Sequence, residues 1–382
     1  EVLISVNNRN PAVFDLHRVN LRTGERSVVE TNNDNFASYL SDNDFNVRFA
    51  QRYNPEGGID VFQKDKSGQW QPMTTIPMED ALTSGPVGIS KDGKRLYMLD
   101  SRNSNTGALV SYDLATGKST VLASNDKADA SGALVNPITE EIEAVSFNYT
   151  RNEWTYLDKE IEAEFKAIRE KIGDGEIALT SRSRDDSVWT IALLDDNGPV
   201  RYYLYDRASD SPTFLFTNNS RLEGLPLSPM HPVVIESRDG LDLVSYLTLP
   251  SWLDANEDMV PDSGPIPMVL LVHGGPWARD AWGFSGQHQW LANRGYAVLS
   301  VNFRGSTGFG KDFINASNLE WGTKMHDDLI DAVNWAVENG VAQRDKVAIR
   351  GGSYGGYATL AGLTFTPDVF AAGVDIVGPS NL

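Results

Sequence analysis

The stretch KVAIRGGSYGGYATL, residues 346–360, places one serine among four glycines where two sequence patterns meet. The β-branched run before the glycines predicts a buried strand, and YATLAGL after them predicts a helix. Between them, residues 351–355 fit G-x-S-x-G, which in this strand–turn–helix context is typical of a nucleophile elbow. Gly351 and Gly355 leave room for a sharp turn that strains the serine backbone. A plain glycine-rich turn is the alternative; we predict Ser353 as an exposed nucleophile.

A second glycine pair follows another buried run. MVLLV, 268–272, leads into His273-Gly274-Gly275-Pro276-Trp277. In α/β-hydrolases the loop after this strand supplies a backbone N–H to the oxyanion, and glycine lets that backbone approach the substrate carbonyl. His273 could act as a general base, but in this motif we expect it to shape the loop. We expect His273, Gly274 and Trp277 to line the cleft.

The region from 229 to 382 alternates strand and helix patterns, which predicts a parallel sheet flanked by helices, as in an α/β-hydrolase domain. The helix pattern at 323–340 is the clearest, with an apolar face made by Met325, Leu329, Ala332, Val333, Ala336 and Val337. The strand runs are continuous and apolar, which fits a sheet covered on both faces. They are MVLLVHGG, YAVLSVNF, KVAIRGG and FAAGVDIVG.

The region from 1 to 228 contains short strand-like runs that repeat. Turns of the kind seen in SKDGKRLYML begin at Ser41, Ser90, Asn136 and Ser183, at intervals of 46 to 49 residues. A second series of turns, near 22–29, 65–73, 114–122 and 206–216, follows about 25 residues later. A period near 47 residues with alternating strands predicts β-propeller blades. Four to five units are visible, fewer than a closed propeller commonly has, so we expect further blades upstream.

One segment of the propeller region breaks this pattern. Residues 156–175 place Ile161, Phe165, Ile168 and Ile172 at helical spacing, which predicts an inserted amphipathic helix. Its carboxylates could form a binding cluster, but a solvated helix face is the expectation.

Composition excludes several classes of partner and site. The net charge is −19, from 33 basic and 52 acidic residues, whereas nucleic-acid binding needs a basic surface. The chain has no cysteine, so disulfides and thiolate metal sites are excluded. No apolar stretch is long enough to span a membrane. No cofactor is expected, and both the compartment, cytoplasmic or periplasmic, and the oligomeric state stay open.

The loop NFRGSTGFGKDF, 302–313, contains three glycines but matches neither nucleotide-binding pattern. Because it follows a strand of the predicted sheet, it should line the cleft. Arg304 could hold a carboxylate or a carbonyl there, or form a structural salt bridge.

Together these residues resemble the prolyl oligopeptidase family of serine peptidases, in its acylaminoacyl-peptidase and dipeptidyl-peptidase-like branch. The resemblance rests on SRDGLDLVSYLTLP, HGGPW, NRGYAVLSVNFRGSTGFG and GGSYGGYATL. It implies that Ser353 is the nucleophile and that backbone N–H groups of Tyr354 and Gly275 form the oxyanion hole. It also implies a propeller that restricts substrates to short peptides.

A catalytic base for Ser353 is not evident. The fold places the triad in the chain order Ser, Asp, His, yet His17, His231, His273, His288 and His326 all precede the serine. Asp375 follows it, but on a strand too early for the triad acid. We therefore expect this sequence to be part of a longer peptidase, with its Asp and His beyond residue 382, and nearly inert alone. A complete protein that has lost catalysis is the alternative.

The substrate remains open among acylated N-termini, free N-terminal dipeptides and internal cuts. The family's dipeptidyl peptidases bind the substrate amine through a glutamate pair, and the adjacent pair here, Glu140-Glu141, lies in a turn that favours solvated charge. An esterase, or a propeller binding module with a vestigial hydrolase half, are the other functions considered.

Overall fold

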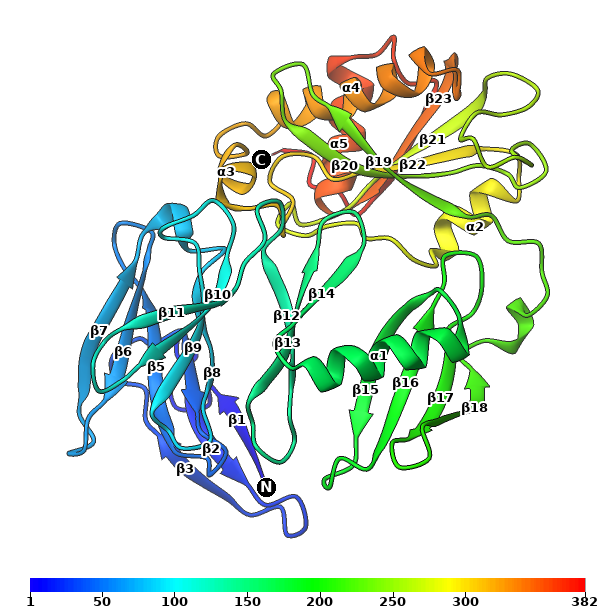
Figure 1. Cartoon of the computed structure of the whole chain (residues 1–382). Helices are drawn as coiled ribbons and strands as arrows, with labels where there is room; N and C mark the ends of the chain where they lie inside the picture. The colour runs from blue at the N-terminus through cyan, green and yellow to red at the C-terminus, as the bar shows by residue number, and fades with distance from the viewer. Residues whose placement is uncertain (382) are drawn as a thin grey trace. The chain divides into compact units, whose positions relative to one another are not determined.

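The structure is a computed structural model that describes residues 1–381. Five small antiparallel sheets precede one larger mixed sheet (Figure 1). The strands of the five are β1 (Val2–Val6), β2 (Asp15–Val19) and β3 (Arg26–Glu30); β4 (Ser38–Ser41), β5 (Val47–Tyr53), β6 (Ile59–Lys64) and β7 (Trp70–Ile76); β8 (Gly85–Ile89), β9 (Arg95–Asp100), β10 (Ala108–Asp113) and β11 (Ser119–Ala123); β12 (Ala130–Val135), β13 (Ile142–Asn148) and β14 (Asn152–Tyr156); β15 (Glu176–Arg182), β16 (Val188–Leu194), β17 (Arg201–Asp206) and β18 (Ser211–Thr217).

The two series of turns occupy fixed places in these sheets. The turns that begin at Ser41, Ser90, Asn136 and Ser183 join the first strand of a sheet to the second. The later series joins the last two strands, as at 114–118 between β10 and β11. Each sheet is therefore one propeller-type blade, and the repeat of about 47 residues is confirmed.

The inserted helix is α1 (Lys159–Ile172), whose first backbone amides are capped by Asp158. Its four predicted apolar residues are buried, and Phe165 packs against Trp189 of the next blade. Its carboxylates are mostly exposed, as expected. Glu164 differs, because it pairs with Arg207 at 2.8 Å and ties the helix to this blade.

Backbone contacts group residues 1–130 and 139–141 in one compact unit, and residues 131–138 and 142 onward in a second. The blade β12–β14 thus shares a unit with the larger sheet. The boundary predicted at 228/229 does fall between the last small sheet and the larger sheet. That it is also a boundary between two domains stays a prediction.

The larger sheet has the strand order β19-β20-β22-β21-β23-β24. A parallel sheet was predicted, and the four runs that carried this prediction do pair in parallel. The sheet is mixed, however, because the hairpin β19–β20 adds to its edge antiparallel to β22. The strands are β19 (Met230–Glu236), β20 (Asp242–Thr248), β21 (Ile266–Val272), β22 (Ala297–Val301), β23 (Ala342–Gly352) and β24 (Ala372–Ile376).

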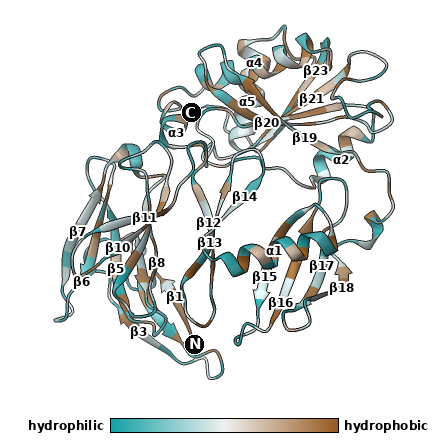
Figure 2. Ribbon diagram, in the orientation of Figure 1, coloured by the Kyte–Doolittle hydropathy of each residue, from teal (hydrophilic) through white to brown (hydrophobic). Residues whose placement is uncertain are grey.

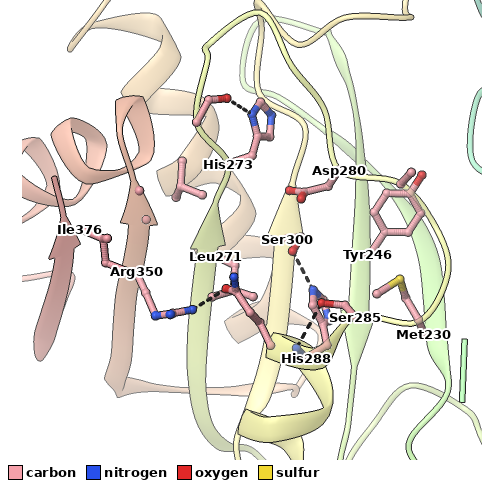
Figure 3. A pocket seen from close by; sticks show the side chains of 16 residues that line it. Met230, Tyr246, Leu271, His273, Asp280, Ser285, His288, Ser300, Arg350 and Ile376 are labelled. Atoms are coloured by element: carbon pink, nitrogen blue, oxygen red, sulfur yellow. Dashed lines mark hydrogen bonds between the residues drawn. The ribbon is translucent and has the colours of Figure 1, made fainter. Parts of the chain in front are cut away.

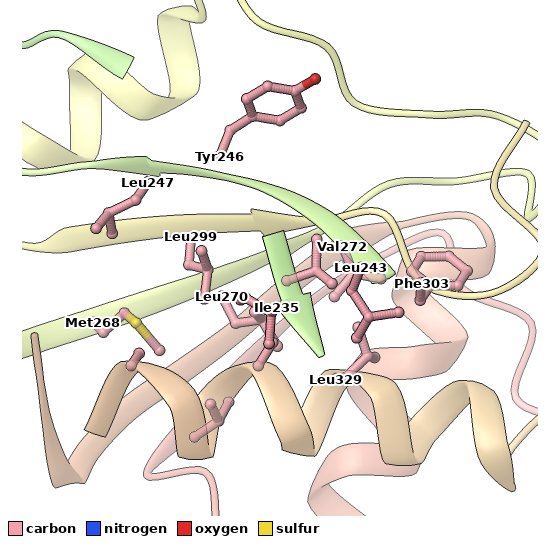
Figure 4. Close-up of a cluster of buried hydrophobic side chains, with 14 of the residues drawn as sticks. Ile235, Leu243, Tyr246, Leu247, Met268, Leu270, Val272, Leu299, Phe303 and Leu329 are labelled. Atoms are coloured by element: carbon pink, nitrogen blue, oxygen red, sulfur yellow. The ribbon is translucent and has the colours of Figure 1, made fainter. Parts of the chain in front are cut away.

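Helices pack on this sheet through the apolar faces that the sequence shows. In α4 (Lys324–Glu338), five of the six predicted face residues are buried, and Leu329 belongs to the same core cluster as Leu243 and Leu270 (Figure 4). Hydrophobic residues run along the strands of this sheet (Figure 2). A fully buried Leu contributes about 1.5–3 kcal/mol. The other helices are α2 (Gly286–Ala292), α3 (Lys311–Asn315), α5 (Tyr354–Phe365) and the short 3₁₀ turns η1 (Met78–Asp80) and η2 (Ser220–Leu222).

Strand β24 differs from the expectation of a buried strand, because all five of its residues are exposed. Within residues 1–381 it pairs only with β23, and Val374 and Ile376 are 51% and 42% exposed. No helix in the described part of the chain is both long and apolar enough to cross a bilayer.

Candidate active site

Ser353 lies at the junction of β23 and α5, where it is the N-cap residue of the helix. Its φ angle is +55°, in the left-handed region that non-glycine residues rarely adopt. Its backbone N–H donates to the carbonyl of Ile376 at 2.9 Å, which ties the turn to the end of β24. The side chain is exposed and its hydroxyl does not cap the helix. The strained, exposed serine predicted from the sequence is what the structure contains.

The glycines around Ser353 are required by close backbone packing. A Cβ at Gly351 would overlap the backbone of Gly355, one turn further along the chain. A Cβ at Gly355 would overlap the carbonyl oxygen of Val272 at the end of β21. Neither clash involves a flexible side chain, so neither could be relieved without moving the turn.

The loop that begins at His273 lies beside the serine. A Cβ at Gly274 would sit 3.4 Å from the Cβ of Ser353 and 3.1 Å from the carbonyl oxygen of Gly352. Gly275 follows with φ +124°, a conformation that favours glycine. The sequence-predicted glycine loop and the serine turn are therefore adjacent.

Tyr354 is the first residue of α5, so its backbone N–H has no acceptor within the helix and is available at the turn. Its side chain does not take part in the site, because it is buried in the core. This burial raises the pKa of its phenol well above the usual value. Only the backbone of Tyr354 is thus offered to the site.

His273 has both ring nitrogens engaged. Nδ1 lies 2.8 Å from the carbonyl oxygen of Gly274, and Nε2 lies 2.9 Å from Oγ of Ser306. The ring also stacks on Phe303, with centroids 4.5 Å apart. This geometry supports the loop-shaping interpretation of His273.

The remaining histidines have other surroundings. His288 bonds Thr248 and Ser300, and His326 bonds Thr366. None of the histidine hydrogen bonds within residues 1–381 reaches Ser353, so the described part of the chain offers it no imidazole base.

Arg304 is buried and forms ion pairs on two sides. Its guanidinium bonds both oxygens of Asp328 and both oxygens of Asp239, at 2.7–2.9 Å. Asp328 is fully buried and burial raises its pKa, whereas the hydrogen bonds from Arg304 lower the pKa of the half-exposed Asp239. The structural salt bridge, one of the two roles considered for Arg304, is therefore the observed one, and the side chain does not line the cleft.

A cavity of about 450 Å³ opens next to the serine turn (Figure 3). His273, Gly274 and Gly352 contribute to its wall, so two of the predicted cleft residues do line a cavity. Trp277 does not belong to this wall; it is 51% exposed and meets the edge of Trp321 at 6.3 Å. The other lining residues are Met230, Tyr246, Leu271, Val272, Asp280, Ala281, Ser285, Gln287, His288, Ser300, Arg350, Gly351 and Ile376.

Polar residues that the sequence analysis did not select hold this site together. Asp280 in the cavity wall has one buried carboxyl oxygen without a hydrogen-bond partner, and burial raises its pKa. Its backbone is held by Asn302, and Ser306 holds His273. The one feature of the sequence that could have pointed to these polar residues is their position in the loops that follow β21 and β22. The part of the chain that the structure describes contains no group of three acidic or histidine side chains arranged for a metal.

Comparison with known proteins assigns the family. The model of the prolyl oligopeptidase family matches residues 282–382. Dipeptidyl aminopeptidase BIII of Pseudoxanthomonas mexicana is 53% identical over 381 residues, which is all of this chain and 55% of the relative. Residues 282–382 belong to the prolyl oligopeptidase family. A second relative, dipeptidyl peptidase family member 6 of Caenorhabditis elegans, is 36% identical over 404 residues, covering all of this chain and 54% of its own length.

Solved structures agree with this family assignment at the level of fold. A puromycin-hydrolyzing peptidase of Mycobacterium tuberculosis matches with a TM-score of 0.69 and 20% identity, over 100% of this chain and 60% of that one. A puromycin hydrolase matches with a TM-score of 0.70 and 19% identity, over 96% and 57%. The chain spans about half the length of the curated relatives it matches.

Proposed function

We propose that this chain carries the nucleophile and oxyanion hole of a serine peptidase that cleaves short peptides. The observation that carries the proposal is the exposed Ser353 at φ +55°, with the Gly274 backbone directly beside it. A substrate carbonyl placed over this turn would face the serine hydroxyl and the backbone N–H groups together. A nucleophile and hydrogen-bond donors that stabilise the oxyanion are two of the parts that acyl transfer requires.

The proposed reaction has two steps. Oγ of Ser353 attacks the carbonyl carbon of the scissile bond, and its proton passes to a base that then protonates the leaving amine. The negative oxygen of the tetrahedral intermediate accepts hydrogen bonds from the N–H groups of Tyr354 and Gly275, each worth about 2.7–4 kcal/mol in the transition state. Water then hydrolyses the acyl-enzyme and regenerates the serine.

We propose that the base and its orienting acid come from residues outside positions 1–382. The support is geometric, since His273 and His288 use both ring nitrogens in other hydrogen bonds. A chain of the length of the relatives would then be active, and residues 1–382 alone would lose most of the rate. Loss of the histidine base alone costs about 10⁶ in kcat in a serine peptidase.

We propose removal of dipeptides from free N-termini as the substrate class. The support is that, of the two relatives matched over this whole chain, one is named a dipeptidyl aminopeptidase and the other a dipeptidyl peptidase family member. We do not propose Glu140-Glu141 as the group that binds the substrate amine. Glu140 accepts a hydrogen bond from Asn43 at 2.6 Å, and Glu141 pairs with Arg95 at 2.7 Å.

Product analysis tests both parts of the proposal. A protein of the relatives' length is incubated with a free heptapeptide, with the same peptide N-acetylated, and with a p-nitrophenyl ester, and the products are identified by mass spectrometry. We expect dipeptides from the free peptide only, and no products with Ser353→Ala. Release of an N-acetylated amino acid would overturn the dipeptidyl specificity, and hydrolysis of the ester without any peptide cleavage would overturn peptidase function.

A further inference from the structure

The turn between β13 and β14 forms a close contact with the loop that follows β21. Three successive carbonyl oxygens of this turn accept hydrogen bonds. Those of Asn148 and Tyr149 accept from Arg279, at 2.6 and 2.9 Å, and that of Thr150 accepts from Oη of Tyr246, at 3.0 Å. The next residue, Arg151, places its guanidinium 3.6 Å from the centre of the Trp282 ring. Each of the four residues 148–151 in this blade turn therefore contacts a side chain of the hydrolase region.

Arg279 occupies a fitted position in this contact. Its guanidinium lies 4.3 Å from the centre of the Phe309 ring, which in turn meets the ring of Tyr149 edge-on at 6.0 Å. Gly308 has φ +92°, and a Cβ there would lie 2.7 Å from Nη1 of Arg279. A planar guanidinium is suited to this place, because it can stack on a ring and donate to two carbonyls at once.

The loop that contains Arg279 is held at both ends. At its start, His273 is bonded to Ser306. At its end, the backbone N–H of Asp280 donates to Oδ1 of Asn302 at 2.8 Å, and Nδ2 of Asn302 donates back to the carbonyl of Asp280 at 3.1 Å. Asn302 is fully buried, so this end has a fixed support. Gly275, the proposed oxyanion donor, lies between the two supports and four residues before Arg279.

We propose that Arg279 is a positioning residue, which uses the blade turn at 148–151 to fix the oxyanion loop and thereby the N–H of Gly275. This inference rests on the proposed function of Gly275. A hydrogen bond to the oxyanion is fully formed only in the transition state, so a loosened loop lowers kcat and leaves KM nearly unchanged. Lysine at position 279 keeps the charge but cannot donate to both carbonyls in the planar geometry of arginine.

Hydrogen exchange of the chain 1–382 tests the structural part without any activity. We compare wild type, Arg279→Lys and the control Arg344→Lys, which changes an exposed arginine on β23. We expect amides of residues 273–279 to exchange at least tenfold faster in Arg279→Lys only, while amides of β21 and β22 keep the wild-type rate. Unchanged exchange in the loop contradicts the proposal. Equal acceleration in the loop and in the two core strands also contradicts it, because Arg279 would then serve general stability.

Kinetics of a protein of the relatives' length test the functional part. With Arg279→Lys we expect kcat to fall tenfold or more, with KM within about twofold and Arg344→Lys unchanged. A rise in KM at constant kcat would overturn the positioning role. If the wild-type protein cleaves no peptide, the proposed function fails; if it cleaves peptides and Arg279→Lys keeps its kcat, this inference alone fails.

Discussion

Gly355 at the start of α5 lies directly against Val272 at the end of β21: a Cβ on the glycine would overlap the carbonyl oxygen of the valine. The same Cβ would lie 3.1 Å from the carbonyl oxygen of His273. The serine turn and the glycine loop are thus packed backbone to backbone. Their separation is set by the absence of a side chain at Gly355, and any atom added there must push the two apart.

The substitution Gly355→Ala tests this packing. We expect a loss of about 1–3 kcal/mol in the free energy of unfolding, because the added methyl group meets rigid backbone. In an active protein we also expect a loss of activity, since the serine and the loop would separate. Urea denaturation and peptide hydrolysis measure the two effects. Gly286→Ala is the matched control, as nothing lies within 4 Å of its Cβ position; an equal effect there would refute the packing argument.

Arg304 lies outside the catalytic machinery, but its ion pairs predict that replacing it lowers the stability of the fold strongly. Arg304→Met leaves Asp328 buried without its charged partner, so we expect the free energy of unfolding to fall by about 3–5 kcal/mol. Arg238→Met is the control, because Arg238 pairs with Asp331 at the surface, where such pairs contribute about 0–1 kcal/mol. Chemical denaturation compares the two, and similar losses would refute the distinction.

His288 predicts a specific pH dependence of stability. Burial lowers the pKa of His288 to about 4, from an ordinary value of 6.5. Between these two values the unfolded chain binds a proton that the folded chain does not, so stability falls as pH drops from 6.5 to 4 and this contribution then levels off. The effect of this one group is at most roughly 3 kcal/mol.

The variant His288→Asn isolates this contribution. We expect a flatter dependence of the unfolding free energy on pH in that window, measured by urea denaturation at several pH values. Buried carboxyls with raised pKa values, such as Asp328, titrate in both proteins and cancel in the comparison. A variant that keeps the full wild-type slope would show that His288 is not the group responsible.

We expect the pair Glu140-Glu141 to contribute little to binding of the substrate amine. Because Glu140 already binds Asn43 and Glu141 already binds Arg95, the double variant Glu140→Gln, Glu141→Gln should change KM for a free N-terminal peptide less than about threefold. Steady-state kinetics with free and N-acetylated peptides measure this. A large rise in KM confined to the free peptide would place the substrate amine at this turn after all.

Local patterns predicted much of this structure. The regular spacing of the turns predicted the blades, and the apolar spacing in α1 and α4 predicted which helix faces are buried. The motif G-x-S-x-G predicted the strained backbone of Ser353. These features depend on neighbours within a few residues, where backbone sterics and apolar periodicity act directly.

Features that depend on distant partners were not predictable. The sequence around Arg304 does not reveal that its partner Asp239 lies 65 residues away, and Arg279 reaches a turn 131 residues earlier. The antiparallel hairpin at the sheet edge likewise follows from pairing and not from local pattern.

Covalent labelling of Ser353 tests the central claim most directly. A protein of the relatives' length and the chain 1–382 are each treated with a fluorophosphonate, and the adduct is located by peptide mass spectrometry. The account predicts an adduct on Ser353 in the longer protein, its loss in Ser353→Ala, and little labelling of the chain 1–382, because the hydroxyl there has no base. An adduct on a different residue, or labelling of Ser353 at the same rate in both proteins, would contradict it.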